Sequence, residues 1–365
     1  MNKRVMISIL QIILLFTMVT GLKNHVIIIP ALLKEAGRDA WMSVIIVFFL
    51  MFVWGILIIY IYRSMKGEHI YDWLEKYIGK LISKIILAVI SFYFIFLASV
   101  TLKEMVIWTN ISYLFKTPAF VLALFFIIPC VITALTSFRT IIVTNFILLI
   151  FVVVFGFFVA FTNMQFKDYA LLRPFLEHGM EPVMKATVFQ GSGMVELIIL
   201  LFLQHRFESP FRYWHFLIIA FILTGLTLGP LIGAIVEFGP VEAASQRYPA
   251  FDEWGLARLG KYIEHVDYLS IYQWLGGALI RISLFIYLAR VLLQPKSSRM
   301  HVGVTIGAGV LILLMVTIPF QEKMFFSLLT KIFLPTSFWF LLGCSLFFGM
   351  IAFISRRKER VEERV

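Results

Sequence analysis

Long apolar runs recur along the chain at a length that predicts membrane-spanning helices. Runs such as residues 44–61 carry no charge, and about twenty apolar residues suffice for an α-helix to cross the hydrocarbon of a bilayer. Lipid cannot hydrogen-bond a backbone, so a spanning segment must be a helix or a strand of a closed barrel. Barrel strands would show apolar alternation over about ten residues, which these runs lack. The pattern predicts an all-α integral membrane protein.

We expect about ten spans in a single transmembrane domain covering residues 1–365. They are placed at residues 5–33, 41–62, 82–109, 119–136, 140–163, 185–203, 213–238, 267–293, 301–318 and 332–354, followed by a short tail at 355–365. Residues 67–80 alternate apolar and polar groups at helical spacing, which predicts a helix lying along the membrane interface. Residues 239–266 contain two prolines and a charged run, and we expect them to form an ordered outer loop.

Composition agrees with a membrane protein: 61% of the residues are hydrophobic and 15% are charged, with a formal net charge of +11. The basic residues gather at span ends, which indicates topology and headgroup contact and argues against a nucleic-acid partner. With the spans above, 18 Lys and Arg fall on the side of the two termini and 11 on the other side. Because the more basic side faces the cytoplasm, both termini are predicted to be cytoplasmic.

Motifs for catalysis or cofactor binding are absent from the sequence. It has no phosphate-binding glycine loop, no His-rich metal spacing and no Gly-x-Ser-x-Gly turn. Cys130 and Cys344 lie inside apolar runs without ligand spacing, so they are interpreted as packing residues. The sequence therefore favours a protein that is not an enzyme and has no cofactor.

The spans divide into two halves, residues 5–163 and 185–354, which predicts a five-plus-five inverted repeat. The first span of each half is interrupted near its middle, at residues 20–25 (TGLKNH) and residues 190–193 (QGSG). Interrupted helices in corresponding positions point to a transporter-type site; alternatively, the glycines allow close helix packing. Free N–H groups at such a break suit a carboxylate and free carbonyls suit an ammonium group or a cation. A zwitterionic amino acid fits both.

Four ionisable residues are expected inside the membrane: Lys23, Glu104, Glu196 and Arg281. Lys23 and Glu196 flank the two breaks, so they are expected to approach one another, either to share the ligand or as a structural ion pair. Glu104 either faces a water path or reaches the surface beside Lys103. The partner of Arg281 is not readable from the sequence. Glu237, at a span end, is expected to be solvated.

Several segments resemble one known family along essentially the whole chain. They are residues 30–41 (PALLKEAGRDAW), Thr117-Pro118, the group Leu172, Pro174, Gly179 and Pro182, and the stretch Tyr248, Pro249, Arg258, Gly260, Ile263, Glu264, Asp267 and Trp274. They resemble the B subunits of spore germinant receptors, the GerAB-type spore germination proteins. The EAGRDAW segment is the most specific piece.

The resemblance implies the ten-helix fold of the amino acid–polyamine–organocation superfamily, with broken helices one and six. It also implies a nutrient-sensing role in the inner membrane of an endospore, together with an A subunit and a lipoprotein C subunit. The superfamily site lies among helices one, three, six and eight, which here places the ligand at Gly21, Lys23, Asn24, Phe96, Val100, Gly191, Ser192, Gly193, Glu196, Ser283 and Tyr287. One departure is that Lys23-Asn24-His25 stands where the family has a small, glycine-containing stretch.

Three hypotheses for function follow. The leading one is a receptor subunit in which a small nutrient, with an amino acid favoured, shifts the helix bundle between two arrangements. The second is an amino acid permease, coupled to protons or another cation. The third is a conduit for water or ions, which requires a continuous polar path past Glu104 and Glu196.

Overall fold

The computed structural model describes residues 6–258 and 265–362, with side chains as far as Lys358. The α-helices are α1 Ile9–Leu22, α2 Ile29–Ala36, α3 Ala40–Ser64, α4 Ile70–Ile78, α5 Lys80–Ser112, α6 Ala119–Leu135, α7 Phe138–Thr162, α8 Met180–Met194, α9 Ile199–Leu203, α10 Tyr213–Phe238, α11 Pro240–Ser245, α12 Pro249–Leu256, α13 Leu269–Leu293, α14 Ser298–Thr317, α15 Glu322–Leu328 and α16 Leu334–Glu362. Gly260, Ile263 and Glu264, three residues of the family resemblance, lie outside the described residues.

The prediction of an all-α membrane protein is confirmed. In the described chain, eight helical stretches are long and apolar enough to cross a membrane. The first, Ile9–Ser64, reverses direction at the turn Gly37–Asp39, and α6 is a shorter apolar helix of 17 residues. The predicted spans therefore each coincide with an observed helix. The count of ten crossings and the inverted repeat remain predictions.

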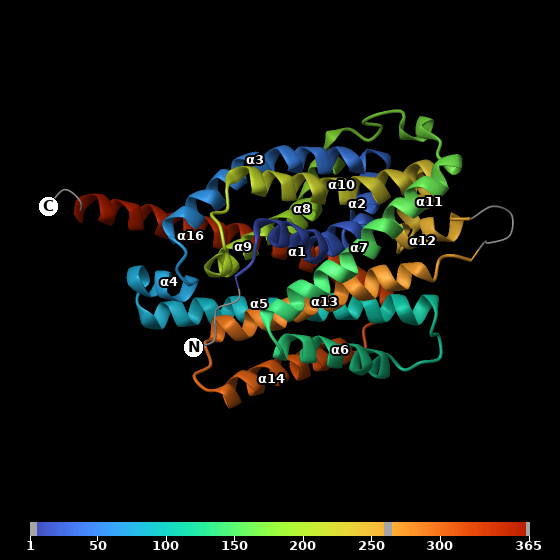
Figure 1. Ribbon diagram of the computed structural model, residues 1–365. Helices are drawn as coiled ribbons and strands as arrows, with labels where there is room; N and C mark the ends of the chain where they lie inside the picture. The colour runs from blue at the N-terminus through green and yellow to red at the C-terminus, as the bar shows by residue number, and fades with distance from the viewer. Residues whose placement is uncertain (1–5, 259–264, 363–365) are drawn as a thin grey trace.

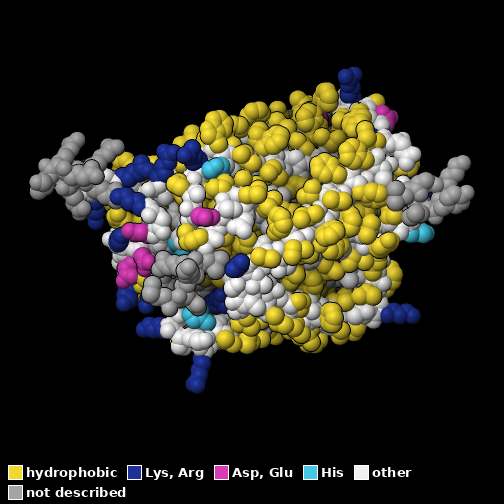
Figure 2. Space-filling view, in the orientation of Figure 1, with side chains coloured by type: hydrophobic (Ala, Val, Ile, Leu, Met, Phe, Trp, Pro, Cys, Tyr) yellow, Lys and Arg dark blue, Asp and Glu magenta, His cyan; other side chains and the backbone are white. Residues whose placement is uncertain are grey.

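The outer surface of the bundle is apolar, as a lipid-facing surface must be. Hydrophobic side chains cover the flank seen in Figure 2, and Lys and Arg gather toward one end. We call this the basic end; it holds α4, the last turns of α3 and the last turns of α16 (Figure 1). The predicted interfacial helix is α4. The chain does not become a tail at residue 355, because α16 continues to Glu362.

The helical stretches that carry Glu196 and Arg281 are the most enclosed. The apolar window of Met180–Arg206 is 83% buried and that of Leu269–Leu293 is 78% buried, whereas those of Phe138–Phe166 and Ser298–Thr317 are 22% and 28% buried. The first two stretches therefore form the centre of the bundle and the last two face lipid. Polar groups on the central helices must find their partners inside the protein.

The interruptions in the first and sixth spans differ from the unwound segments expected. The first is a π turn, Lys23–Ile27, between α1 and α2. The second is a 3₁₀ turn, Val195–Ile198, which begins after Gly193, so residues 190–193 remain helical within α8. Both helices change their hydrogen-bonding pattern without opening. A change of helix type frees a few carbonyls at little cost, whereas an open segment in the membrane would expose many polar groups.

Candidate functional site: a buried ion triad

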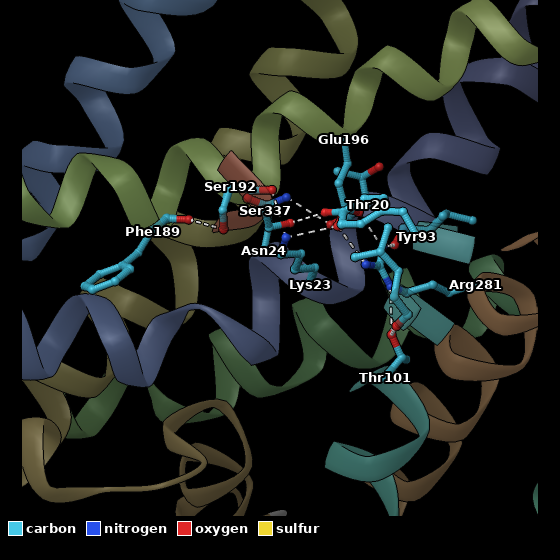
Figure 3. A network of polar contacts seen from close by, with 12 residues as sticks. Thr20, Lys23, Asn24, Tyr93, Thr101, Phe189, Ser192, Glu196, Arg281 and Ser337 are labelled. Carbon is cyan, nitrogen blue, oxygen red and sulfur yellow. Dashed lines mark hydrogen bonds and ion pairs between the residues drawn. The ribbon is translucent and has the colours of Figure 1, made fainter. Parts of the chain in front are cut away.

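Glu196 lies at the centre of the bundle between two cations (Figure 3). Its Oε1 is 3.0 Å from Lys23 Nζ and accepts a 2.9 Å hydrogen bond from Arg281 Nη2. Its Oε2 accepts a 2.7 Å bond from Arg281 Nη1. The three side chains are at most 1% exposed. The expected approach of Lys23 to Glu196 is confirmed, and the partner of Arg281 is the same carboxylate.

Backbone carbonyls complete the triad at the two places where the helices change type. The Lys23 N–H bonds three residues back, to Thr20 O, so the Val19 carbonyl is released and accepts a 2.7 Å bond from Arg281 Nη1. On α8, just before the 3₁₀ turn, the Ser192 carbonyl accepts a 2.8 Å bond from Lys23 Nζ. The π turn and the 3₁₀ turn thus supply the extra acceptors that two buried cations need.

The triad has a net charge of +1, since two cations share one carboxylate. Arg281 is the better satisfied of the two. It binds Glu196 with two nitrogens, donates from Nε to Thr101 Oγ1 at 3.0 Å and lies 4.6 Å from the centre of the Phe285 ring. Lys23 has one oxygen of a shared carboxylate, one carbonyl and the Phe333 ring at 5.6 Å. Lys23 is therefore the cation best placed to accept a further anion.

Two buried oxygens beside the triad have no hydrogen-bond partner within the described protein (Figure 3). They are Thr20 Oγ1 and Asn24 Oδ1. The Asn24 amide nitrogen is occupied, because it donates to Thr20 O at 2.9 Å. Buried polar atoms are normally paired with protein or water, so these oxygens mark places where a ligand ammonium group or water can bind.

The glycines of the sixth span serve close packing, the alternative left open by the sequence. A Cβ on Gly193 would lie 2.5 Å from Asn24 Oδ1, and one on Gly191 would lie 2.6 Å from the Phe338 ring. A Cβ on Gly21 would meet a Leu226 methyl at 3.0 Å. The first two glycines allow α8 to approach the π turn Lys23–Ile27 and α16 closely enough for Lys23 and Glu196 to meet.

The remaining predicted ligand residues divide into two groups. Phe96 packs against Phe333 with ring centres 5.2 Å apart, and Val100 is buried on the same helix. Ser283 instead donates to the Cys130 carbonyl on α6. Tyr287 accepts a 3.3 Å bond from Arg206. The structure therefore does not bring Ser283 and Tyr287 to the triad.

Several residues of the site were missed by sequence reasoning. Thr101 binds Arg281, and Tyr93 and Ser337 share a short hydroxyl hydrogen bond beside the network. Phe333 and Ser337 come from the last helical stretch, which also contains a π turn, Leu329–Phe333. Small hydroxyl residues inside apolar helices are common, so no pattern in the sequence distinguishes these from ordinary packing residues.

Glu104 forms a second buried ion pair, toward the end of the bundle opposite the basic end. Arg247 Nη2 contacts its two carboxylate oxygens at 2.5 and 2.7 Å, and the Tyr248 hydroxyl donates at 3.4 Å. Glu104 is 1% exposed, so it does not reach the surface beside Lys103. The Arg247 guanidinium also lies 4.6 Å from the centre of the Phe326 ring on α15. Through Arg247, the segment between α11 and α12 therefore contacts both α5 and α15.

Arg247→Gln is expected to lower the free energy of unfolding by about 3 kcal/mol, because it leaves the Glu104 carboxylate buried without a cation. Arg247→Gln with Glu104→Gln is expected to recover most of the loss. The measurement is thermal unfolding of the purified protein in one detergent. Lys185→Gln is the matched control, since Lys185 and Glu181 form an exposed pair and its loss should change stability by less than about 1 kcal/mol. Equal losses of stability in Arg247→Gln and Lys185→Gln would contradict the buried pair.

Glu237 is buried, in contrast to the solvated position expected for it. Its side chain is 0% exposed, accepts a 2.9 Å bond from Asn163 and faces Lys167 at 3.5 Å. Asn163 also donates to the carbonyl of Glu253 on α12, which covers this end of α10. Burial raises the pKa of the Glu253 carboxyl well above its ordinary value, and repulsion from Glu237 adds to the effect. The expectation failed because α12, in the loop that follows α10, folds back over the end of that helix.

Comparison with known proteins identifies the family of this chain. The sequence profile of the spore germination protein family, also called spore permease, matches residues 6–325. The chain belongs to the spore germination protein family. It is similar to "Spore germination protein XB" of Bacillus anthracis, with 40% identity over 355 residues, covering 97% of this chain and 100% of that protein. It is also similar to YfkT of Bacillus subtilis (strain 168), provisionally named a spore germination protein, with 25% identity over 289 residues and 75% of each chain covered.

Membership in the spore germination family, together with the apolar helices, makes this chain a germination-related, multi-pass membrane protein. The family is not one of known enzymes. The resemblance of this chain to the family, noted in several segments of the sequence, is thereby confirmed over nearly the whole chain.

Proposed function

We propose that this chain is the membrane subunit of a spore germinant receptor that senses a small nutrient, with an amino acid as the favoured ligand. The observation that carries the proposal is the buried triad, in which Lys23 and Arg281 share the single carboxylate of Glu196. A ligand carboxylate can pair with Lys23 while Arg281 keeps Glu196. The free oxygens of Thr20 and Asn24 supply acceptors for a ligand ammonium group.

A ligand bound at the triad can change the packing of several helices. The triad and its partners join α1, α5, α8 and α13. A carboxylate that draws Lys23 from the Ser192 carbonyl weakens the link between α1 and α8, so the ligand favours a different packing of these helices. We propose that this shift is passed to an A subunit and a lipoprotein C subunit in the inner spore membrane, with both termini of this chain in the cytoplasm.

Lys23→Met is expected to raise the nutrient concentration needed for germination by about tenfold or more, the effect of losing one charge-assisted hydrogen bond. The assay follows the fall in optical density of spores across a panel of amino acids, with the protein level checked by immunoblot. Lys185→Gln, at an exposed ion pair, should respond like the wild type. If Lys23→Met spores also respond like the wild type to every nutrient, the ligand does not bind at Lys23.

An amino acid permease is the second candidate, and the permease name of the family profile favours it. Purified protein in liposomes separates the two functions. A receptor subunit binds labelled amino acid without accumulating it, whereas a permease accumulates it inside the vesicles when a proton or cation gradient is applied. Accumulation by this chain alone would replace the receptor proposal.

A further inference from the structure

A cavity of about 270 Å³ opens at the basic end, away from the triad. Its lining is Ile56, Ile59, Tyr60, Arg63, Tyr213 and Arg356. The first four belong to the last turns of α3, and the other two come from the first turn of α10 and the late part of α16. Because α3 packs against both α10 and α16, it forms the floor of the cavity and the other two helices form its walls.

The cavity holds two positive charges and no lining carboxylate among the described residues. Arg356 is half-buried and lies with its guanidinium 4.4 Å from the centre of the Tyr60 ring. Arg63 is exposed. A stacked guanidinium is held in one orientation with its N–H donors free for a planar or tetrahedral oxyanion. Two arginines that converge on one cavity, with no carboxylate in its described lining, favour an anionic occupant.

The cavity is also continuous with the lipid-facing surface. Ile56 is 62% exposed, and Val53, one turn earlier on α3, is 70% exposed. Trp214, beside Tyr213, is 70% exposed, as expected of an aromatic residue at a membrane interface. The occupant must therefore present an anion at the arginines and hydrocarbon along α3.

We propose that this cavity binds the phosphodiester headgroup of an anionic phospholipid, with the acyl chains lying along the exposed face of α3. Basic pockets between transmembrane helices bind such headgroups, and Lys and Arg gather at this end of the molecule (Figure 2). A soluble phosphate would satisfy the arginines but would leave Ile56 and Ile59 in the cavity lining without an apolar partner. The bound lipid joins α3, α10 and α16 at one point.

Native mass spectrometry of the full chain, titrated in detergent with phosphatidylglycerol or phosphatidylcholine, tests the proposal. Phosphatidylglycerol is expected to bind at one site and phosphatidylcholine is not. Arg63→Gln with Arg356→Gln should raise the phosphatidylglycerol dissociation constant by about tenfold or more. The control is Arg139→Gln with Arg357→Gln, two exposed arginines outside the cavity lining, which should change it less than about twofold.

Thermal unfolding without added lipid should be the same for both double variants, which separates lost binding from lost folding. Equal weakening by the control pair would show that surface charge alone attracts the lipid and would overturn the site. Equal binding of phosphatidylcholine would overturn recognition of the anion. Displacement of phosphatidylglycerol by millimolar inorganic phosphate would overturn the assignment to a lipid in favour of soluble phosphate.

Discussion

Glu196→Gln is expected to be the most damaging substitution in the central triad, lowering the free energy of unfolding by about 3–5 kcal/mol. The variant leaves the side chains of Lys23 and Arg281, each 1% exposed, as two buried cations without an anion. Lys23→Met should cost far less, about 1 kcal/mol, because it leaves Glu196 and Arg281 as a neutral, doubly hydrogen-bonded pair. Arg281→Gln should fall between them, since Arg281 also binds Val19 and Thr101.

Thermal unfolding followed by tryptophan fluorescence, in one detergent for all variants, measures this order. Adding Lys23→Met to Glu196→Gln removes one of the two unpaired cations and is expected to restore part of the lost stability. A Lys23→Met variant as unstable as Glu196→Gln would contradict the excess positive charge, because it would mean that Lys23 is needed to balance the site.

Gly193→Ala is expected to lower the free energy of unfolding by about 1–3 kcal/mol through overpacking. The new methyl would lie 2.5 Å from Asn24 Oδ1. It must therefore displace the Asn24 amide, which donates to Thr20 O, or push α8 away from the π turn Lys23–Ile27. Either movement separates the elements that hold Lys23 and Glu196, so nutrient responsiveness should fall together with stability.

Gly225→Ala on α10 is the matched control, because a Cβ there meets nothing within 4 Å. In an open helical position alanine is expected to stabilise by about 0.5–1 kcal/mol relative to glycine. Asn24→Ala combined with Gly193→Ala removes the obstructing amide, so the double variant should be more stable than the sum of the single changes predicts. Additive losses would place the cause of the Gly193 effect elsewhere.

The spans and their order could be predicted from the sequence because they depend on the contrast between lipid and water. An apolar run of sufficient length must become a spanning helix wherever it stands in the fold, and α5, α10 and α13 lie within a few residues of their predicted positions. The pairing of Lys23 with Glu196 was predictable for the same reason. A buried charge requires an opposite one, and few were available.

The form of the helix interruptions was decided by tertiary contacts. Glycines mark places where a helix can unwind, but they equally mark places where two helices touch. Gly191 and Gly193 take the second role because Phe338 and Asn24 lie against them. The backbone changes type just outside them, where carbonyls are needed for Lys23 and Arg281.

What the sequence determined by itself is therefore the class of the protein, the order of its spans and the presence of charges that must be paired inside the membrane. The tertiary structure decided that Arg281 joins Glu196, that Arg247 seals Glu104 and that Ser283 and Tyr287 turn to other partners. Burial follows from the local run of side chains. Which side chains pair with one another depends on which face of one helix meets which face of another. That is set only when the whole bundle packs.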